Sequence, residues 1–310
     1  MSTVKNYLSL VRFSHTIFAM PFALIGFFLG VTSIGFSVVP GWHALVVPGW
    51  HTVIYPKEYF VFLFVKVVLC MVFARSAAMA FNRWLDVKWD ALNPRTAIRE
   101  IPAGIISKNS ALWFVVINCL LFITCTWFIN PLCFVLSFVA LAVVLGYSYT
   151  KRFTPLCHLV LGLGLSLAPI GAYLAVTGRF AVLPILFSLT VLFWVSGFDI
   201  IYALQDEEFD RSNRLYSMPA WLGKEKSLRI SELLHLFSTL CVVIAGLYGG
   251  FGIWYWIGVA IFMGMLVYQH IIVKPNDLSR VNLAFMTANG IASVVFAVFV
   301  IADICLWTPR

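Results

Sequence analysis

The sequence is short of charge. Asp, Glu, Lys and Arg make up only 11% of its 310 residues, whereas 62% of the residues are hydrophobic. A soluble domain carries about 25% charged residues, and a chain this apolar cannot cover a water-exposed surface with polar side chains. A disordered chain is excluded as well, because so apolar a composition collapses in water. The composition therefore indicates an integral membrane protein, and its long apolar runs indicate a helical one.

The chain also lacks the cysteine patterns of a metal site or a disulfide framework. Its seven cysteines include no Cys-x-x-Cys pair, and most lie inside apolar runs, where cysteine behaves as a small buried hydrophobe. The first apolar run begins near Ile17 without a small-residue cleavage site and is followed by further runs. We therefore expect this run to be a membrane helix and not a removed signal peptide.

Nine apolar runs approach the roughly 20 residues that a helix needs to cross a bilayer. They cover residues 15–38, 58–81, 111–129, 132–150, 156–177, 181–203, 231–250, 253–273 and 283–307. With the N-terminus inside, 16 of the 21 Lys and Arg residues fall in inside segments, three fall outside and two lie within the second run. This bias is the positive-inside pattern. The sequence predicts one polytopic domain, residues 1–310, in the inner (cytoplasmic) membrane, with the C-terminus outside.

The net charge of +8 would favour nucleic-acid binding in a soluble protein. Here the basic residues follow the predicted topology, where they would meet anionic lipid at the cytoplasmic surface. The expected partner is therefore the lipid bilayer and not nucleic acid, and no protein partner is evident.

The few acidic residues are concentrated at two places. Eight of the thirteen lie at or after the cytoplasmic ends of the second and sixth runs: Asp86, Asp90, Glu100, Asp199, Asp206, Glu207, Glu208 and Asp210. Asn82, Asp86 and Asp90 are spaced four apart, so on a continuing helix they share one face, and Asp206 and Asp210 repeat the spacing. An ionised Asp at bilayer depth costs about 2.5–3.5 kcal/mol. This placement predicts a bound cation.

The donor types favour magnesium. Oxygen ligands without a His or Cys set suit Mg²⁺ better than zinc, and Mg²⁺ usually combines one or two carboxylates with phosphate oxygens. The sequence therefore predicts two facing acidic helix ends, in loops of about residues 82–110 and 205–230, that bind magnesium and a phosphorylated ligand. Nearby basic residues available to that ligand are Arg83, Arg95, Arg99, Lys151, Arg152 and Arg211. The alternative is an ion-paired network that only joins the helix ends.

The two loops also echo each other. Ile101-Pro102-Ala103 precedes Lys108, and Met218-Pro219-Ala220 precedes Lys224. Membrane proteins built from internal repeats often place their binding site where the repeats meet. The predicted fold class is therefore an all-α membrane protein with nine transmembrane helices in two related halves around a central cavity.

These motifs resemble the UbiA superfamily of intramembrane prenyltransferases over nearly the whole chain. The first family motif is matched by Asn82-x3-Asp86-x3-Asp90, and the second by Asp206-x3-Asp210 with the upstream Asp199-x2-Tyr202. The Tyr-x3-Lys element is matched by Tyr147 and Lys151. The opening Arg12-Phe-Ser-His15 resembles the first helix of the 4-hydroxybenzoate polyprenyltransferase branch.

The resemblance implies an enzyme that transfers a polyprenyl group from a polyprenyl diphosphate to an aromatic acid, such as 4-hydroxybenzoate, in respiratory quinone biosynthesis. It implies Mg²⁺ as cofactor and an active site on the cytoplasmic side. The implied metal ligands are Asn82, Asp86, Asp90, Asp206 and Asp210. Lys151 and Tyr147 would meet the diphosphate or the ionising carbon, and Arg95 and Arg211 would be further diphosphate contacts.

The resemblance also offers residues for the acceptor. Asp199 would act as a base or orient the acceptor, Arg12 would pair with its carboxylate, and His15 would orient it. The alternatives are a topology anchor for Arg12 and a helix-end or packing role for His15.

Two departures from the family pattern concern the acceptor. Arg83 stands where many relatives carry a second acid, and Glu100 stands where 4-hydroxybenzoate enzymes commonly have Pro. The Arg-Glu-x-Pro-Ala-Gly form at residues 99–104 resembles enzymes of the futalosine route to menaquinone, so 1,4-dihydroxy-6-naphthoate is the alternative acceptor. A cation-coupled transporter is the alternative from another class, but it predicts carboxylates near the bilayer midplane. The clustering of acids at helix ends favours the diphosphate.

Overall fold

A computed structural model describes residues 3–11, 18–34 and 57–306. Within these ranges the chain forms helices, and the β-bridges are limited to an isolated pair of Lys274 with Asp277. The helices are α1 (Thr3–Leu10), α2 (Met20–Ser33), α3 (Lys57–Leu85), α4 (Val87–Leu92), α5 (Lys108–Trp127), α6 (Pro131–Thr150), α7 (Cys157–Thr177), α8 (Val182–Ala203), α9 (Glu207–Ser212), α10 (Met218–Gly249), α11 (Ile253–Ile272) and α12 (Asn289–Leu306). A 3₁₀ turn, η2 (Leu204–Asp206), precedes α9, and a π-helix, η3 (Leu283–Ala288), precedes α12.

The predicted helical membrane fold is confirmed. Eight helices in the described ranges are long and apolar enough to cross a bilayer. The first predicted crossing contains α2, which has 14 residues and is therefore about 21 Å long. The residues that flank α2, 12–17 and 35–56, lie outside the described ranges. The predicted count of nine crossings is therefore approximate.

Local signals in the sequence set the tight turns between the helices. Asn130 caps α6 by accepting a hydrogen bond from the backbone N–H of Cys133 at 2.8 Å, and Pro131 occupies the first turn, where a missing N–H costs nothing. The turn after α10 uses Gly250, whose φ of 59° lies in the left-handed region that glycine adopts without strain.

α10 begins earlier than the predicted span at residue 231. Ser217 caps its N-terminus by accepting from the backbone N–H of Ala220 at 3.3 Å, and the charged residues that follow lie on helix, with Arg229 and Glu225 paired at 2.7 Å. Gly223 interrupts the helix with a φ of 78°. The lack of charged residues identified the apolar part of this helix from residue 231 onward. It did not identify the charged turns of helix that precede this part.

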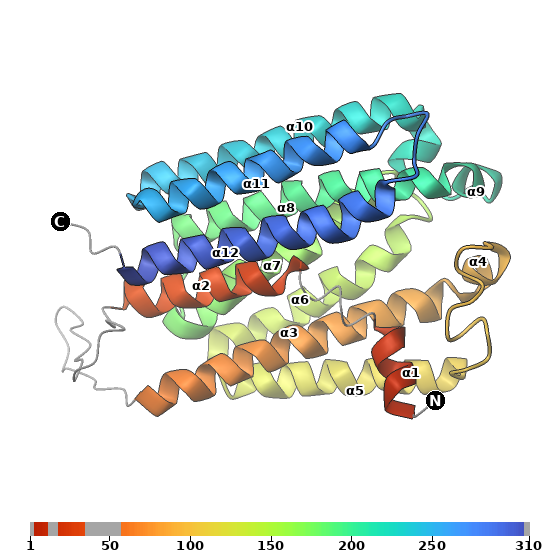
Figure 1. The fold of residues 1–310 in the computed structure, drawn as a ribbon. Helices are drawn as coiled ribbons and strands as arrows, with labels where there is room; N and C mark the ends of the chain where they lie inside the picture. The colour runs from red at the N-terminus through yellow and green to blue at the C-terminus, as the bar shows by residue number, and fades with distance from the viewer. Residues whose placement is uncertain (1–2, 12–17, 35–56, 307–310) are drawn as a thin grey trace.

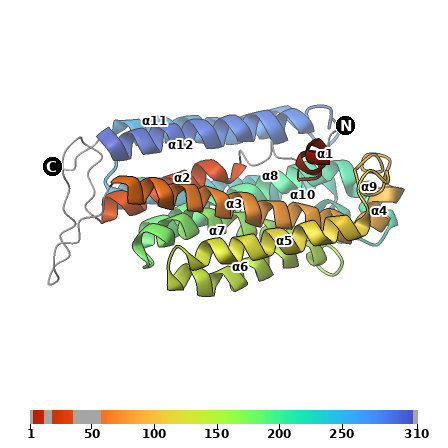
Figure 2. The same ribbon diagram turned by 90° about the horizontal axis from the view of Figure 1, so that it is seen from below.

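The helices run side by side along the length of the molecule (Figure 1). The two short helices α4 and α9, which follow α3 and α8, lie at the same end, together with α1, while the described chain ends with α12 at the opposite end (Figure 1). Seen from below, α11 and α12 form one side and α5 and α6 the other, with α2 and α8 between them (Figure 2). α8 packs most extensively against α10 and α7. Its residues Trp194 and Phe187 are fully buried in an aromatic core.

Candidate active site

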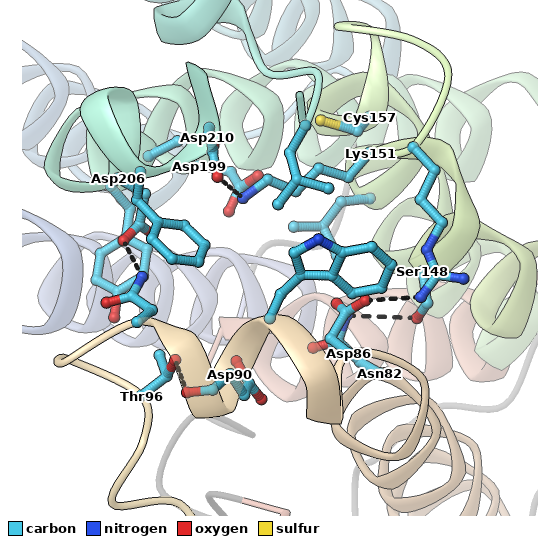
Figure 3. A pocket seen from close by; sticks show the side chains of 18 of the residues that line it. Asn82, Asp86, Asp90, Thr96, Ser148, Lys151, Cys157, Asp199, Asp206 and Asp210 are labelled. Atoms are coloured by element: carbon cyan, nitrogen blue, oxygen red, sulfur yellow. Dashed lines mark hydrogen bonds and ion pairs between the residues drawn. The ribbon is translucent and has the colours of Figure 1, made fainter. Parts of the chain in front are cut away.

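A polar cavity of about 230 Å³ lies where the first and second acidic motifs meet. Its walls come from α3, α4, α6, α7, α8, α9 and the segments between them. The predicted site residues that line it are Asn82, Asp86, Asp90, Arg95, Tyr147, Lys151, Asp199, Asp206 and Asp210. Asn82, Asp86 and Asp90 lie across the cavity from Asp199, Asp206 and Asp210 (Figure 3). Two segments more than 100 residues apart in sequence thus form one site.

The first motif stays on one face although its helix is interrupted. α3 ends at Leu85 and α4 begins at Val87. The backbone N–H of Asp86 nevertheless donates to the carbonyl of Asn82 at 2.9 Å, and that of Asp90 donates to the carbonyl of Asp86 at 2.8 Å. These bonds keep the four-residue spacing of a helix, so the three side chains line the same cavity.

The second motif is held more tightly. The Asp210 side chain is fully buried; the Ser217 hydroxyl donates to its Oδ2 at 2.8 Å, and Lys151 Nζ lies 2.8 Å from its Oδ1. Because Ser217 also caps α10, the start of that helix fixes Asp210. The backbone N–H of Tyr216 donates to the carbonyl of Lys151 at 2.7 Å, which fixes the lysine from the same segment.

Each motif carboxylate faces a basic side chain. The pairs are Asp86 with Arg152 at 3.1 Å, Asp90 with Arg99 at 2.8 Å, Asp210 with Lys151 at 2.8 Å, and Asp206 with Arg95. Arg95 comes from the loop after the first motif, and its neighbour Asn93 donates to Asp206 Oδ1 at 3.2 Å. The cavity therefore contains the ion-paired network that was the alternative to a ligand site, and this network joins the two motifs.

The charges of the cavity nearly balance. Five carboxylates line it, those of the four paired aspartates and Asp199, against four cationic side chains, those of Arg95, Arg99, Lys151 and Arg152. Burial raises the pKa of Asp86 to about 6, although hydrogen bonding and attraction to Arg152 oppose the rise. Burial lowers the pKa of Lys151, but the adjacent Asp210 carboxylate outweighs burial and the net pKa is raised. Lys151 is therefore a charged group at the cavity wall.

The donor set suits a hard cation. The carboxylate and amide oxygens of Asn82, Asp86, Asp90, Asp206 and Asp210 face one cavity, and oxygen is the ligand atom that Mg²⁺ prefers. In the described part of the chain, no three His, Cys, Asp or Glu side chains already converge on a single metal position. Their oxygens are directed instead at the basic side chains. The residues fit magnesium if it replaces those basic partners.

An apolar cavity of about 320 Å³ adjoins the polar one. The two cavities share Tyr147 and Leu161. The apolar cavity lies between α3, α5, α6 and α7, and on α6 it extends from Tyr147 to Cys133, about 21 Å along the helix axis. Its length and its apolar lining would suit a long apolar group.

One cation lies in this apolar wall. Arg75 of α3 lines the apolar cavity, and its Nε has no hydrogen-bond partner among the described residues. It is close enough to Tyr147 for the two groups to interact electrostatically. The sequence showed Arg75 only as a charge within the second span. Its cost at that depth was a signal that could have singled it out.

One predicted contact, Arg211, lies outside the cavity, and two others lie outside the described residues. The Arg211 side chain is 60% exposed and pairs with Glu207 at 2.7 Å, because it follows Asp210 on α9 and therefore points about 100° away around the helix. Arg12 and His15 lie outside the described residues. Sequence reasoning did not single out His158, which lines the polar cavity.

The two departures from the family pattern meet in the structure. Arg83 forms an ion pair with Glu100, and the Ser9 hydroxyl of α1 donates to the same carboxylate. The Arg83 side chain is only 4% exposed, so the pair is buried beside the first motif. An acid at position 100 thus compensates the charge at position 83.

Residues 50–291 match the model of a family described as the UbiA prenyltransferase family. Among curated relatives, 4-hydroxybenzoate octaprenyltransferase of Francisella tularensis subsp. novicida (strain U112) is 29% identical over 231 residues, 74% of this chain and 81% of that protein. The protein of the same name from Tolumonas auensis is also 29% identical, over 228 residues, 74% of this chain and 79% of that one.

Solved structures share the fold. The apo structure of a UbiA homologue from Aeropyrum pernix K1 matches with a TM-score of 0.77 at 27% identity, over 93% of this chain and 98% of that one. A UbiA homologue from Archaeoglobus fulgidus, bound to DMAPP and Mg²⁺, matches with a TM-score of 0.68 at 20% identity, over 97% and 100%. At this lower identity the likeness concerns the fold.

Proposed function

The chain belongs to the UbiA prenyltransferase family, and we propose that it transfers a polyprenyl group from a polyprenyl diphosphate to an aromatic acid, with Mg²⁺ as cofactor. The observation that carries the proposal is the pair of adjoining cavities, one with both acidic motifs and one apolar. A polyprenyl diphosphate has the same division into a charged head and an apolar tail. The names of the relatives and the DMAPP and Mg²⁺ bound by the Archaeoglobus homologue support the same substrates.

The polar cavity would hold the diphosphate with magnesium. Asn82, Asp86, Asp90, Asp206 and Asp210 would be the metal ligands, and bound Mg²⁺ stabilises the charge that develops on the leaving diphosphate. Arg95, Arg99, Arg152 and Lys151 would exchange their carboxylate partners for phosphate oxygens, which accept charge-assisted hydrogen bonds equally well. The near balance of charge in the cavity suits a ligand that carries both positive and negative charge, as a diphosphate with Mg²⁺ does.

The apolar cavity would hold the prenyl tail. Each buried CH₂ contributes about 0.8 kcal/mol, and the walls are mainly apolar side chains. Because the two cavities meet at Tyr147 and Leu161, the first carbon of the tail would lie at that junction. Tyr147 and Lys151 would then flank the bond that breaks.

Arg75 is a second candidate for the carboxylate of the aromatic acid. Its guanidinium lies near Tyr147, where the cavities meet, and a guanidinium pairs bidentately with a carboxylate. Arg12, proposed from the sequence, keeps that role as a prediction because it lies outside the described residues, as does His15.

The reaction would proceed by electrophilic substitution on the ring. The bond between the allylic carbon and the diphosphate oxygen breaks, and its electron pair leaves with the diphosphate. A ring carbon ortho to a phenol forms the new bond to the allylic carbon. The proton on that ring carbon passes to a base, for which Asp199 is the cavity-lining candidate, and the electrons of the C–H bond restore aromaticity.

The acceptor is either 4-hydroxybenzoate or 1,4-dihydroxy-6-naphthoate. The relatives' names favour the benzoate. The Arg83–Glu100 pair favours the naphthoate, since it fixes the loop form that resembles the menaquinone-route enzymes.

The protein is a multi-pass membrane protein. We propose that the end that carries α4 and α9 faces the cytoplasm at the inner membrane. The basic residues concentrate in the segments at that end, as the positive-inside pattern requires.

A transfer assay on purified protein in lipid tests the proposal. It supplies a radiolabelled allylic diphosphate with Mg²⁺ and offers the two acceptors in parallel, with Asp86→Ala and Asp206→Ala as controls. We expect magnesium-dependent product with one acceptor and loss of product in both variants. Diphosphate binding without product would point to another ring as acceptor. No diphosphate binding at all would contradict the proposal and favour the cation-coupled transporter.

A further inference from the structure

Asp199 differs from the other four carboxylates of the polar cavity. Each of those pairs with Lys or Arg, whereas the partner of Asp199 is His158, whose Nδ1 lies 2.7 Å from Asp199 Oδ2. Among the described residues, no Lys or Arg forms an ion pair with Asp199.

The hydrogen bonds of His158 decide which of its nitrogens carries the proton. The backbone N–H of Met218 donates to His158 Nε2 at 3.3 Å. Because a backbone N–H only donates, Nε2 must present a lone pair, and the proton of the neutral ring lies on Nδ1. The Nδ1–H therefore donates to Asp199, which accepts as a carboxylate.

The histidine is held on several sides. Its side chain is 4% exposed, against 23% for Asp199, and the Ser196 hydroxyl of α8 donates to its backbone carbonyl at 3.2 Å. Met218 follows Ser217, whose hydroxyl binds Asp210. The first residues of α10 thus fix both the Asp199–His158 pair and the second metal motif.

We propose that His158 is a positioning residue for Asp199, one that fixes the carboxylate as the base of the transfer reaction. The inference rests on the proposed function. In this step the allylic C–O bond has broken and the ring has formed its new C–C bond. The ring C–H bond then breaks, its electrons return to the ring, and Asp199 takes the proton. His158 keeps its Nδ1 proton throughout and orients the accepting oxygen.

The other titratable groups around Asp199 are known from the walls of the cavity. They are Asp86 between α3 and α4, Asp90 of α4, Arg95 and Arg99 of the loop that follows, Tyr147 of α6, Lys151 and Arg152 after that helix, Cys157 of α7, Tyr202 and Asp206 of the α8–η2 segment, and Asp210 of α9. Lys151 and Asp206 already pair with Asp210 and Arg95. His158 is therefore the group whose removal changes the hydrogen bonding of Asp199 directly.

The test compares His158→Leu with His158→Asn. The leucine removes the donor, whereas the asparagine amide can offer an N–H near the Nδ1 position. We expect His158→Leu to lower kcat by about 10- to 100-fold, as loss of an orienting partner does at other sites. The acid limb of the kcat–pH profile should move to higher pH by about one unit, because the carboxylate loses a hydrogen bond that favours its charged form. His158→Asn should restore most of kcat and the position of the limb.

Two further measurements separate this role from a merely structural one. Binding of an unreactive allylic thiodiphosphate with Mg²⁺ should be unchanged within about twofold in both variants, since the hydrogen bonds of His158 go to Asp199, Ser196 and Met218 and to no proposed metal ligand. His235→Leu is the matched control: His235 is as buried as His158, at 3% exposed, and lines neither cavity. It should leave the acid limb in place whatever it does to stability.

The outcomes are distinguishable. A His158→Leu variant with the kcat and pH profile of the wild type would overturn the positioning role while the proposed function stands. Loss of thiodiphosphate binding in that variant would also overturn it, because His158 would then act on the diphosphate site. If the wild type itself transfers no prenyl group to either acceptor, the proposed function fails first.

Discussion

The two adjoining cavities differ in the number of charged side chains in their walls. In the polar cavity nine charged side chains nearly neutralise one another through short ion pairs, whereas the apolar cavity has one charged side chain among its described walls, that of Arg75. Buried ion pairs are costly to break but specify geometry, and apolar walls select mainly by size. The polar cavity should therefore determine whether transfer occurs, and the apolar cavity which prenyl donor is used.

The largest effect should come from the most buried carboxylate of the polar cavity, that of Asp210. Asp210→Ala removes the partner of Lys151 and a proposed metal ligand, so we expect transfer to fall by about 1,000-fold. Because the lysine is left without its partner, unfolding should also become easier by about 3 kcal/mol, the low end for a broken buried pair. Steady-state kinetics with a geranyl and an octaprenyl donor, and thermal unfolding in detergent, measure the two effects.

If the polar cavity determines whether transfer occurs, Asp210→Ala should lower the rate of transfer equally with the geranyl and the octaprenyl donor. A variant that kept the short donor and lost only the long one would show that Asp210 supports the tail and not the diphosphate.

Two arginines test the wall of the polar cavity. Arg95→Gln removes the Nε donor that lies 3.1 Å from Asp206 and the link between the two motif loops, and we expect KM for the diphosphate to rise by about 10-fold or more. Arg211→Gln is the matched control, because its side chain is 60% exposed and lies outside the cavity. It should change KM by less than about threefold, as exposed ion pairs contribute little. An equal rise in KM in both variants would contradict the placement of Arg95 in the cavity wall and of Arg211 outside it.

These arginines also show where sequence reasoning succeeds and where it fails. The four-residue spacing of Asn82, Asp86 and Asp90 predicted a shared face, and all three line one cavity, because local helical geometry determines that face. Arg211 seemed equivalent to Arg95 because both follow an acidic motif. Its direction follows from its place one residue after Asp210 on α9, about 100° around the helix, which the prediction did not take into account.

Long-range partners were beyond the sequence. His158 becomes part of the site only when α7, α8 and the start of α10 meet, as its bonds to Asp199 and Met218 show. The helical membrane fold needed no such contact, since apolar runs and basic loops determine it. The start of α10 at Met218 was missed because hydropathy reports the lipid-embedded part of a helix alone.

A smaller effect should separate the donors by length. Gly171 of α7 lines the apolar cavity, and a Cβ at this position would meet no atom within 4 Å, so Gly171→Leu should extend into the cavity. We expect kcat/KM for the octaprenyl donor to fall by about 10-fold relative to the geranyl donor, which corresponds to the one or two methylenes that a leucine displaces. The measurement is competition between the two donors.

Gly264→Leu on α11 is the control for Gly171→Leu. A Cβ at Gly264 also meets no atom within 4 Å, but this residue lines neither cavity. It should leave the donor ratio unchanged, and a shift as large as that of Gly171→Leu would indicate a general effect of leucine on the helices.

The smallest effect should be the pH dependence of magnesium binding at the first motif. Since burial raises the pKa of Asp86 to about 6, the metal-free fold gains stability from the protonated carboxyl below the usual Asp pKa of about 4, and this gain is lost between about pH 4 and pH 6. Magnesium needs the ionised form. Its affinity should therefore fall about twofold from pH 8 to pH 6, where half of the carboxyl is protonated, and more steeply below.

Calorimetric titration of Mg²⁺ over this range, with Asp86→Asn as the comparison, measures the effect. The asparagine variant should bind weakly at every pH and lose the inflection near pH 6, because the amide does not titrate. An inflection near pH 6 that survives in Asp86→Asn would mean that a group of the second motif titrates there. The pH dependence of magnesium binding would then come from the second motif and not from Asp86.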